Sequence, residues 1–148
     1  MTRNSLRFTL LPLAACAIVA AAPDPFAYTL EMTPEEGPVV PAIERRYTAA
    51  FQTCQQQAEI TPDIASCYVA EFPRQDAALN RAWSATLHRL PAASHAALLA
   101  AQRKWIAARD RFCDAKSDEF RGGTIVPIIY ANCRVEQTIR RTIWLERL

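Results

Sequence analysis

The sequence predicts an all-α fold, a small disulfide-stapled bundle of four to five helices. Apolar residues recur at helical spacing along most of the chain after residue 42, and no segment alternates in the manner of a β-strand. Four cysteines remain once an N-terminal leader is set aside. The chain length is consistent with such a bundle, because 148 residues with 51% apolar content suffice for one domain with a single core.

The N-terminus has the composition of a secretory signal peptide. Arg3 and Arg7 precede a short apolar run that ends in small residues at Ala22. This run is shorter than the ~20 residues that a membrane-spanning helix needs, and no later segment approaches that length. We therefore expect residues 1–22 to be a signal peptide, with no transmembrane span in the mature, periplasmic or secreted protein.

Two cleavage sites remain open. Val19-Ala20-Ala21 offers small residues to ordinary signal peptidase, whereas Leu13-Ala14-Ala15-Cys16 resembles the bacterial lipoprotein box and makes Cys16 a candidate for lipidation. Either reaction removes Cys16 as a free thiol.

Charge is distributed unevenly behind the leader. Residues 23–44 hold five acids and no base, whereas residues 45–148 hold 15 bases and 10 acids. The mature chain is thus close to neutral, which argues against nucleic acid as a partner. Residues 23–41 also contain five of the ten prolines and predict a Pro-rich acidic tether ahead of a helical domain at 42–148.

Apolar stripes predict the helices in order. The first runs from Ala42 to about Glu59, with Ile43, Tyr47, Phe51 and Cys54 on one face. Thr61-Pro62-Asp63 predicts the start of the second, with Thr61 as its N-cap. Pro73 either kinks this helix or separates it from the stripe formed by Leu79, Trp83, Leu87 and Leu90.

Two further helices complete the bundle. One spans about residues 92–120, with Leu98, Ala101, Trp105, Ala108 and Phe112 inward. It stops at Gly122 and Gly123, where glycine permits a left-handed turn. The last begins at Thr124 or Val126 and ends at Arg147, with Ile128, Val135, Ile139 and Ile143 inward.

The cysteines are Cys54, Cys67, Cys113 and Cys133. An even number in an oxidising compartment predicts two disulfide bonds. A zinc site is disfavoured because no CxxC pair occurs and the only histidines, His88 and His95, lie elsewhere, so we expect no metal. Three pairings are open; we favour Cys54–Cys67 and Cys113–Cys133, since each would staple one helical hairpin.

Catalytic machinery is not evident, and we expect a non-enzymatic protein without a cofactor. Ser84 and His88 lie one helical turn apart but lack an identifiable third group. Trp144 beside Arg140, Arg141 and Arg147 indicates either the edge of the core or a binding patch.

Several polar and apolar residues form a recognisable set. It comprises Asp76, Leu79 and Asn80, the string from Gln102 through Trp105, Arg109 and Asp110, the pair Gly122-Gly123, and Arg140. From the residues alone, an Asp76–Arg109 ion pair would join two helices if both side chains were partly buried.

This set, together with the four ordered cysteines, resembles the lysozyme-inhibitor LprI-type N-terminal domain family of bacterial envelope proteins, over about residues 50–148. The resemblance implies a small secreted or lipid-anchored helical domain, in a family with at least one member that inhibits lysozyme. It marks no inhibitory residue, and the shared positions look architectural.

The leading hypothesis is therefore a protein that binds a protein partner, such as a lysozyme or another muramidase. The alternative is a structural or assembly factor of the cell envelope. Animal-type lysozymes are basic, as the resemblance implies, so inhibition would favour a negative surface. Candidates are the acidic arm at 24–44 and the cluster Asp114, Asp118 and Glu119.

Overall fold

A computed structural model describes residues 40–148, and it is all-α in that range. The elements are α1 (Val40–Glu44), α2 (Ala49–Gln57), α3 (Thr61–Arg89), the 3-10 turn η2 (Ala92–Ser94), α4 (His95–Asp118) and α5 (Val126–Arg147). No strand occurs among these residues, which confirms the predicted helical bundle. The predicted signal peptide, Cys16 and the tether up to residue 39 lie outside the described residues.

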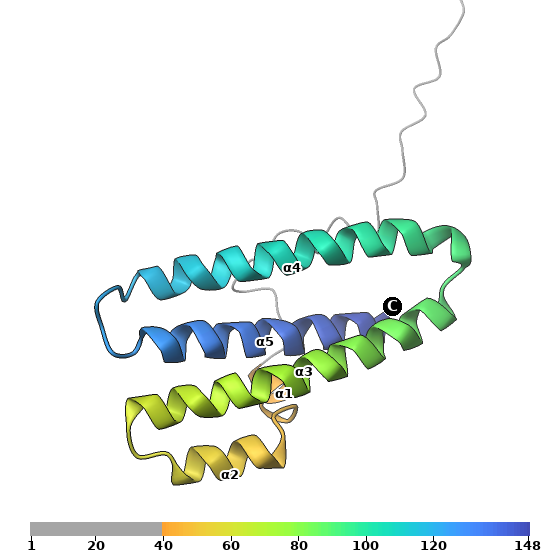
Figure 1. Cartoon of the computed structure of the whole chain (residues 1–148). Coiled ribbons are helices and arrows are strands. Elements are labelled where there is room, and N and C mark those ends of the chain that lie inside the picture. Colours follow the sequence, from red (N-terminus) through yellow and green to blue (C-terminus); the bar gives the residue numbers. More distant parts are fainter. Residues whose placement is uncertain (1–39) are drawn as a thin grey trace, which may run out of the picture.

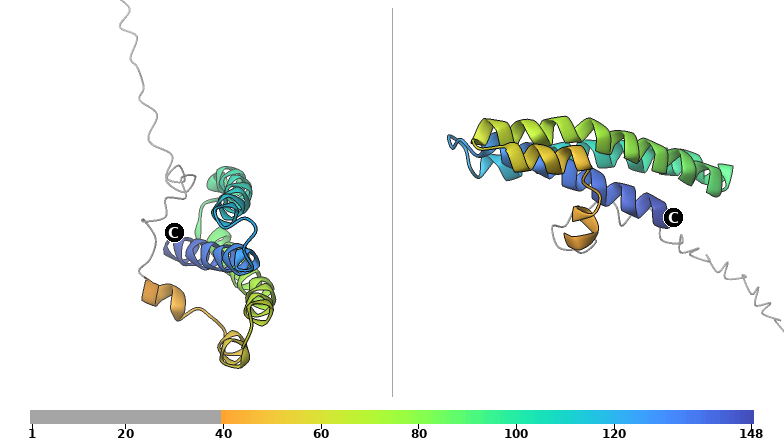
Figure 2. Two further views of the ribbon diagram at one scale, coloured as in Figure 1. Left: turned by 90° about the vertical axis from the view of Figure 1, so that its left-hand side faces the viewer. Right: turned by 90° about the horizontal axis from the view of Figure 1, so that it is seen from below.

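The long helices lie side by side in the order α4, α5, α3, with α2 against the outer side of α3 (Figure 1). α3 and α5 run in the same direction, because α4, which connects them in the sequence, runs the opposite way. Seen end-on, the row is curved, and the short α1 lies beside α5 (Figure 2). α5 therefore contacts α1, α3 and α4 and is the central helix.

The predicted first helix is broken, which corrects the sequence interpretation. α1 ends at Glu44, α2 begins at Ala49, and α1 includes Val40 and Pro41 from the predicted tether. The hydroxyl Oγ1 of Thr48 caps α2 by accepting a hydrogen bond from the backbone N–H of Phe51 at 3.2 Å. Residues 45–48 thus form a turn between two short helices instead of helical backbone.

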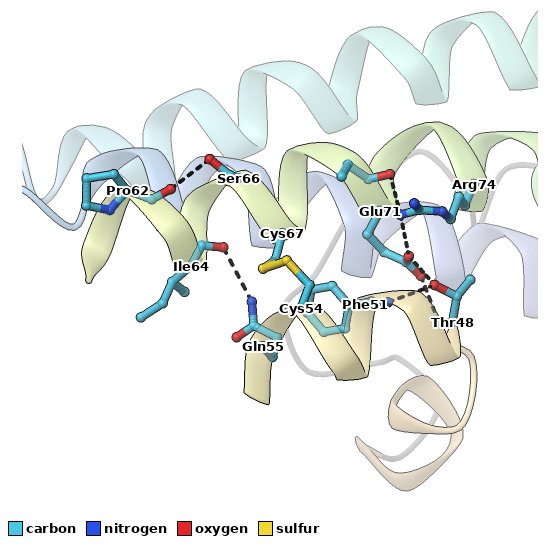
Figure 3. Close-up of a disulfide and its surroundings, with 11 residues drawn as sticks. Thr48, Phe51, Cys54, Gln55, Pro62, Ile64, Ser66, Cys67, Glu71 and Arg74 are labelled. Carbon is cyan, nitrogen blue, oxygen red and sulfur yellow. Dashed lines mark hydrogen bonds and ion pairs between the residues drawn. A yellow bond between two sulfur atoms is a disulfide. The ribbon is translucent and has the colours of Figure 1, made fainter. Parts of the chain in front are cut away.

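The fully buried carboxylate of Glu71 on α3 holds this turn. It accepts hydrogen bonds from the backbone N–H of Thr48 at 2.9 Å and from the Thr48 hydroxyl at 2.6 Å (Figure 3). Gln75 donates to the same carboxylate at 2.7 Å and to the carbonyl of Arg46 at 2.8 Å. These contacts compensate the burial of the charge and fix the entry of α2 onto α3.

α3 is one continuous helix through Pro73, which settles the alternative left open by the sequence. Pro73 is exposed, whereas Glu71, Gln75 and Leu79 on either side of it are buried. Packing on both sides thus maintains the helix although proline lacks an amide donor. The helix begins at Thr61 itself, with Ile60 at the N-cap position and no side-chain cap, contrary to the predicted role of Thr61.

The core lies on both sides of α5. One cluster comprises Ile43, Val135, Ile139 and Ile143, a second comprises Leu79, Ala82, Trp105 and Leu145, and a third comprises Leu98 and Ala101. Half-buried Trp83 and Trp144 join the second and third clusters. Three residues predicted to point inward, Ala108, Phe112 and Ile128, are only half-buried.

Two disulfide bonds staple the bundle. Cys54–Cys67 joins α2 to α3 with a Cα–Cα distance of 5.7 Å (Figure 3), and Cys113–Cys133 joins α4 to α5 at 5.6 Å. This is the pairing that the two predicted hairpins favoured. Both separations are normal for disulfides, so each bond fits the helix packing around it.

Candidate functional site

The polar residues of the sequence string line the inner face of α4. Gln102, Trp105 and Arg109 are 8%, 4% and 4% exposed, and their spacing places them on one side of the helix. They face α5, while Leu79 of α3 packs against Trp105. The string therefore lies in a polar seam between the central helices rather than on an open surface.

Arg109 is held by groups other than the one that the sequence suggested. Its Nε and a terminal nitrogen each lie 2.9 Å from Oδ1 of Asp110, and Nη1 donates to the hydroxyl of Thr138 on α5 at 3.3 Å. Asp76 instead accepts a hydrogen bond from Asn80 on its own helix at 3.3 Å. The expected Asp76–Arg109 pair is not formed, and Asp110 binds Arg109 in its place.

Arginines and aromatic rings alternate along this seam. In order they are Tyr130, Arg134, Phe72, Arg109, Trp105, Arg141 and Trp144. The shortest guanidinium-to-centroid distances are 3.9 Å for Arg134 over Phe72 and 4.0 Å for Arg141 over Trp144. A desolvated contact of this kind is worth up to about 2 kcal/mol. This row of seven side chains, the cation–ring ladder, therefore stabilises the packing of α3, α4 and α5.

The ladder contains guanidinium atoms that lack hydrogen-bond partners. Arg141 is 3% exposed and donates from Nε to Gln102 at 2.8 Å, but its Nη2 has no partner. Burial lowers the pKa of Arg141 to about 10. Nε of Arg134 lies 3.6 Å from Asp110, beyond hydrogen-bonding range, and outside the ladder Nε of half-buried Arg140 is also unpaired. For Arg134 and Arg141, the neighbouring ring faces replace part of the hydration that the two cations lose on burial.

The Ser84 and His88 pair considered from the sequence is not assembled in the structure. Ser84 and His88 are both exposed, and no hydrogen bond joins them. Residues 40–148 contain no group of three or more histidine, cysteine or acidic side chains placed to hold a metal ion. Trp144 is half-buried against two core clusters, and Arg141 is turned inward over its ring, as the edge-of-core interpretation requires.

A shallow hollow of about 240 Å³ lies between α1 and α5. Its lining is Ala42, Arg45, Arg46, Ile143, Glu146 and Arg147. Arg46 and Glu146 form a two-pronged ion pair there at 2.9 and 2.6 Å, with both side chains about 40% exposed. The pair ties the turn before α2 to the end of α5, so part of the charge of this hollow is already neutralised.

The turn between α4 and α5 is a second surface feature, besides the hollow. Gly122 adopts a φ of +87°, which side chains rarely tolerate, and a Cβ on Gly123 would lie 3.1 Å from the carbonyl oxygen of Phe120. The backbone therefore favours glycine at position 122, and a side chain at position 123 would require the Phe120 carbonyl to shift. Asp114, Asp118 and Glu119 of the predicted acidic cluster are exposed near this turn.

A family model described as lysozyme inhibitor LprI matches residues 52–145, most of the described chain. The chain belongs to the LprI family. It is also similar to an uncharacterized protein of Rhizobium meliloti (strain 1021), with 31% identity over 99 residues that cover 58% of this chain and 71% of the relative. No solved structure matches. Among residues 40–148, no helix combines the length and apolar character needed to cross a membrane.

The LprI match includes all four cysteines and the α4 string. The sequence analysis did not predict all the residues that form the seam. Phe72, Arg134 and Thr138 complete the surroundings of Arg109. An indication was available, since arginines and aromatic residues recur at helical spacing in α5, from Tyr130 through Arg134 to Arg141 and Trp144. The partner rings on other helices could not be assigned from that spacing.

The seam predicts unequal effects for two aspartates. Asp110→Ala should lower the free energy of unfolding by about 1–2 kcal/mol, because Arg109 is buried and would lose its carboxylate. Asp76→Ala, which removes one contact within α3, should change it by less than about 0.5 kcal/mol. Urea denaturation of both variants measures the difference, and equal losses would contradict this assignment.

Proposed function

We propose that the protein is an exported, non-enzymatic binding protein that inhibits a lysozyme or another muramidase by occluding its cleft. The match of residues 52–145 to the LprI family carries this proposal. The polar seam adds support, because the motif residues Gln102, Trp105 and Arg109 are buried among their own neighbours. They shape the bundle that presents a binding surface.

We also infer the compartment in which the protein works. The signal peptide predicted at residues 1–22 and the two disulfide bonds both favour an oxidising location outside the cytoplasm. We place the protein in the periplasm or the medium, with attachment through a lipid on Cys16 as the second form. In either case residues 23–39 would lie in sequence between the cleavage site and the helical domain.

An inhibition titration tests the function. Oxidised protein lacking residues 1–22 is titrated against animal-type and bacterial lysozymes at low and moderate salt. We expect stoichiometric inhibition that disappears when both disulfides are reduced, since the bundle presents the binding surface. Reduced and alkylated protein is the matched control.

Absence of inhibition of every lysozyme at tens of micromolar would refute the proposal. The assembly-factor alternative would then be favoured, and it predicts co-purification with an envelope complex without any effect on muramidase.

A further inference from the structure

The α4–α5 tip, defined as residues 119–125, is the most exposed turn between long helices. Every residue in it is exposed, and it contains two large apolar side chains, Phe120 and Ile125, that are 44% and 43% exposed. They stand on either side of the double glycine. Two exposed apolar side chains on one projecting turn offer apolar area that a partner could bury.

The position of the tip makes it a narrow, convex end of the molecule. In Figure 1 and in the right-hand view of Figure 2, the turn extends beyond the start of α3 and beyond α2. Only the two helices α4 and α5 lead into it. A projecting turn suits entry into a groove on a partner better than the broad side of the bundle does.

The tip is also held in one conformation. Backbone N–H groups of Phe120, Arg121 and Gly123 donate to the carbonyls of Ser117, Asp118 and Phe120 at 3.1, 3.1 and 2.9 Å. The disulfide Cys113–Cys133 fixes the two helices below. Such preorganisation reduces the entropy lost on binding.

From these observations we propose that the α4–α5 tip enters the cleft of a glycan-cleaving enzyme, a step that rests on the proposed function. Such clefts are concave, largely apolar and contain paired carboxylates. Phe120 and Ile125 would occupy apolar sugar subsites. The Arg121 side chain is 78% exposed, and its surface pair with Asp118 is weak enough to be exchanged for an enzyme carboxylate.

The charge around the tip suits a basic enzyme. Residues 114–121 hold three acids, Asp114, Asp118 and Glu119, and two bases, Lys116 and Arg121. The domain as a whole has the opposite balance, with 15 bases and 10 acids over residues 45–148. A basic muramidase is therefore repelled less by this segment than by the domain as a whole.

The test compares two double variants of the oxidised chain. Phe120→Ser with Ile125→Ser alters the tip, and Leu99→Ser with Ile106→Ser alters two equally exposed apolar residues of α4, at 41% and 40%. Both should keep the wild-type Tm and helical circular dichroism. Loss of two central anchor side chains should weaken inhibition by about 100-fold or more in the tip variant, and the α4 variant should stay within about threefold of wild type.

Kinetics with a chromogenic N-acetylglucosamine oligomer locate the contact. The wild-type protein should raise KM without changing kcat, because the tip and the glycan would occupy the same cleft. A change in kcat alone would overturn cleft entry. Full inhibition by the tip variant would overturn the role of the tip and leave the proposed function intact, whereas a wild-type protein that inhibits no lysozyme would refute both.

Discussion

Replacing Cys113 and Cys133 together by alanine should lower the free energy of unfolding by about 3 kcal/mol, because the bond closes a loop of the unfolded chain. The two residues are 0% and 2% exposed and join the central α5 to α4. Domains of this size are stable by only about 5–15 kcal/mol, so the loss is a large fraction of the total. Urea denaturation followed by circular dichroism measures it.

The other disulfide provides the matched comparison. Replacing Cys54 and Cys67 by alanine removes a shorter loop, with a sequence separation of 13 instead of 20, and Cys54 is only half-buried. We expect a somewhat smaller loss, with the α3–α5 core retained. A loss below about 1 kcal/mol for the Cys113 and Cys133 pair would contradict the view that this bond stabilises the bundle.

Local signals explain why much of the fold was predictable. The apolar stripes of α3, α4 and α5 and the paired glycines lie within single helices or turns, so spacing alone revealed them. The disulfide pairing followed from the hairpins that these helices form. Val135, Ile139 and Ile143 are buried as their stripe required.

Contacts distant in sequence explain what was missed. The stripe from Ile43 to Phe51 is compatible with one helix, and only the buried carboxylate of Glu71, 23 residues after Thr48, reveals why the chain turns instead. The same applies to α5, which was assigned one inward face. Thr138 and Leu145 are fully buried as well, because α5 has neighbours on several sides.

The candidate site was predictable only in part. The sequence string on α4 indicated structural residues, and Gln102, Trp105 and Arg109 do lie in the seam. Asp76 was assigned to Arg109 because both are polar groups beside apolar stripes, a rule that cannot distinguish a partner on another helix from the adjacent Asp110. The importance of Phe120 and Ile125 depends on their position at an exposed tip, which spacing does not reveal.

Trp105→Ala should destabilise the protein by about 3–5 kcal/mol, the usual cost of truncating a buried tryptophan. Its side chain is 4% exposed and packs among Leu79, Ala82 and Leu145 from the two neighbouring helices. The change would also remove a ring that lies 5.2 Å from the Arg109 guanidinium and 5.4 Å from that of Arg141. The loss should thus affect all three long helices at once.

Two further variants separate the contribution of the Trp105 side-chain volume to stability from that of its contacts with the arginines. Trp105→Phe keeps an aromatic face for Arg109 and Arg141, so it should lose less stability than Trp105→Ala. Ile106→Ala, at the next position but 40% exposed, should change the free energy of unfolding by less than about 0.5 kcal/mol. Urea denaturation followed by circular dichroism at 222 nm measures the free energy of unfolding of all three variants. If Trp105→Ala were no worse than Ile106→Ala, Trp105 would not be the residue that joins the seam to the core.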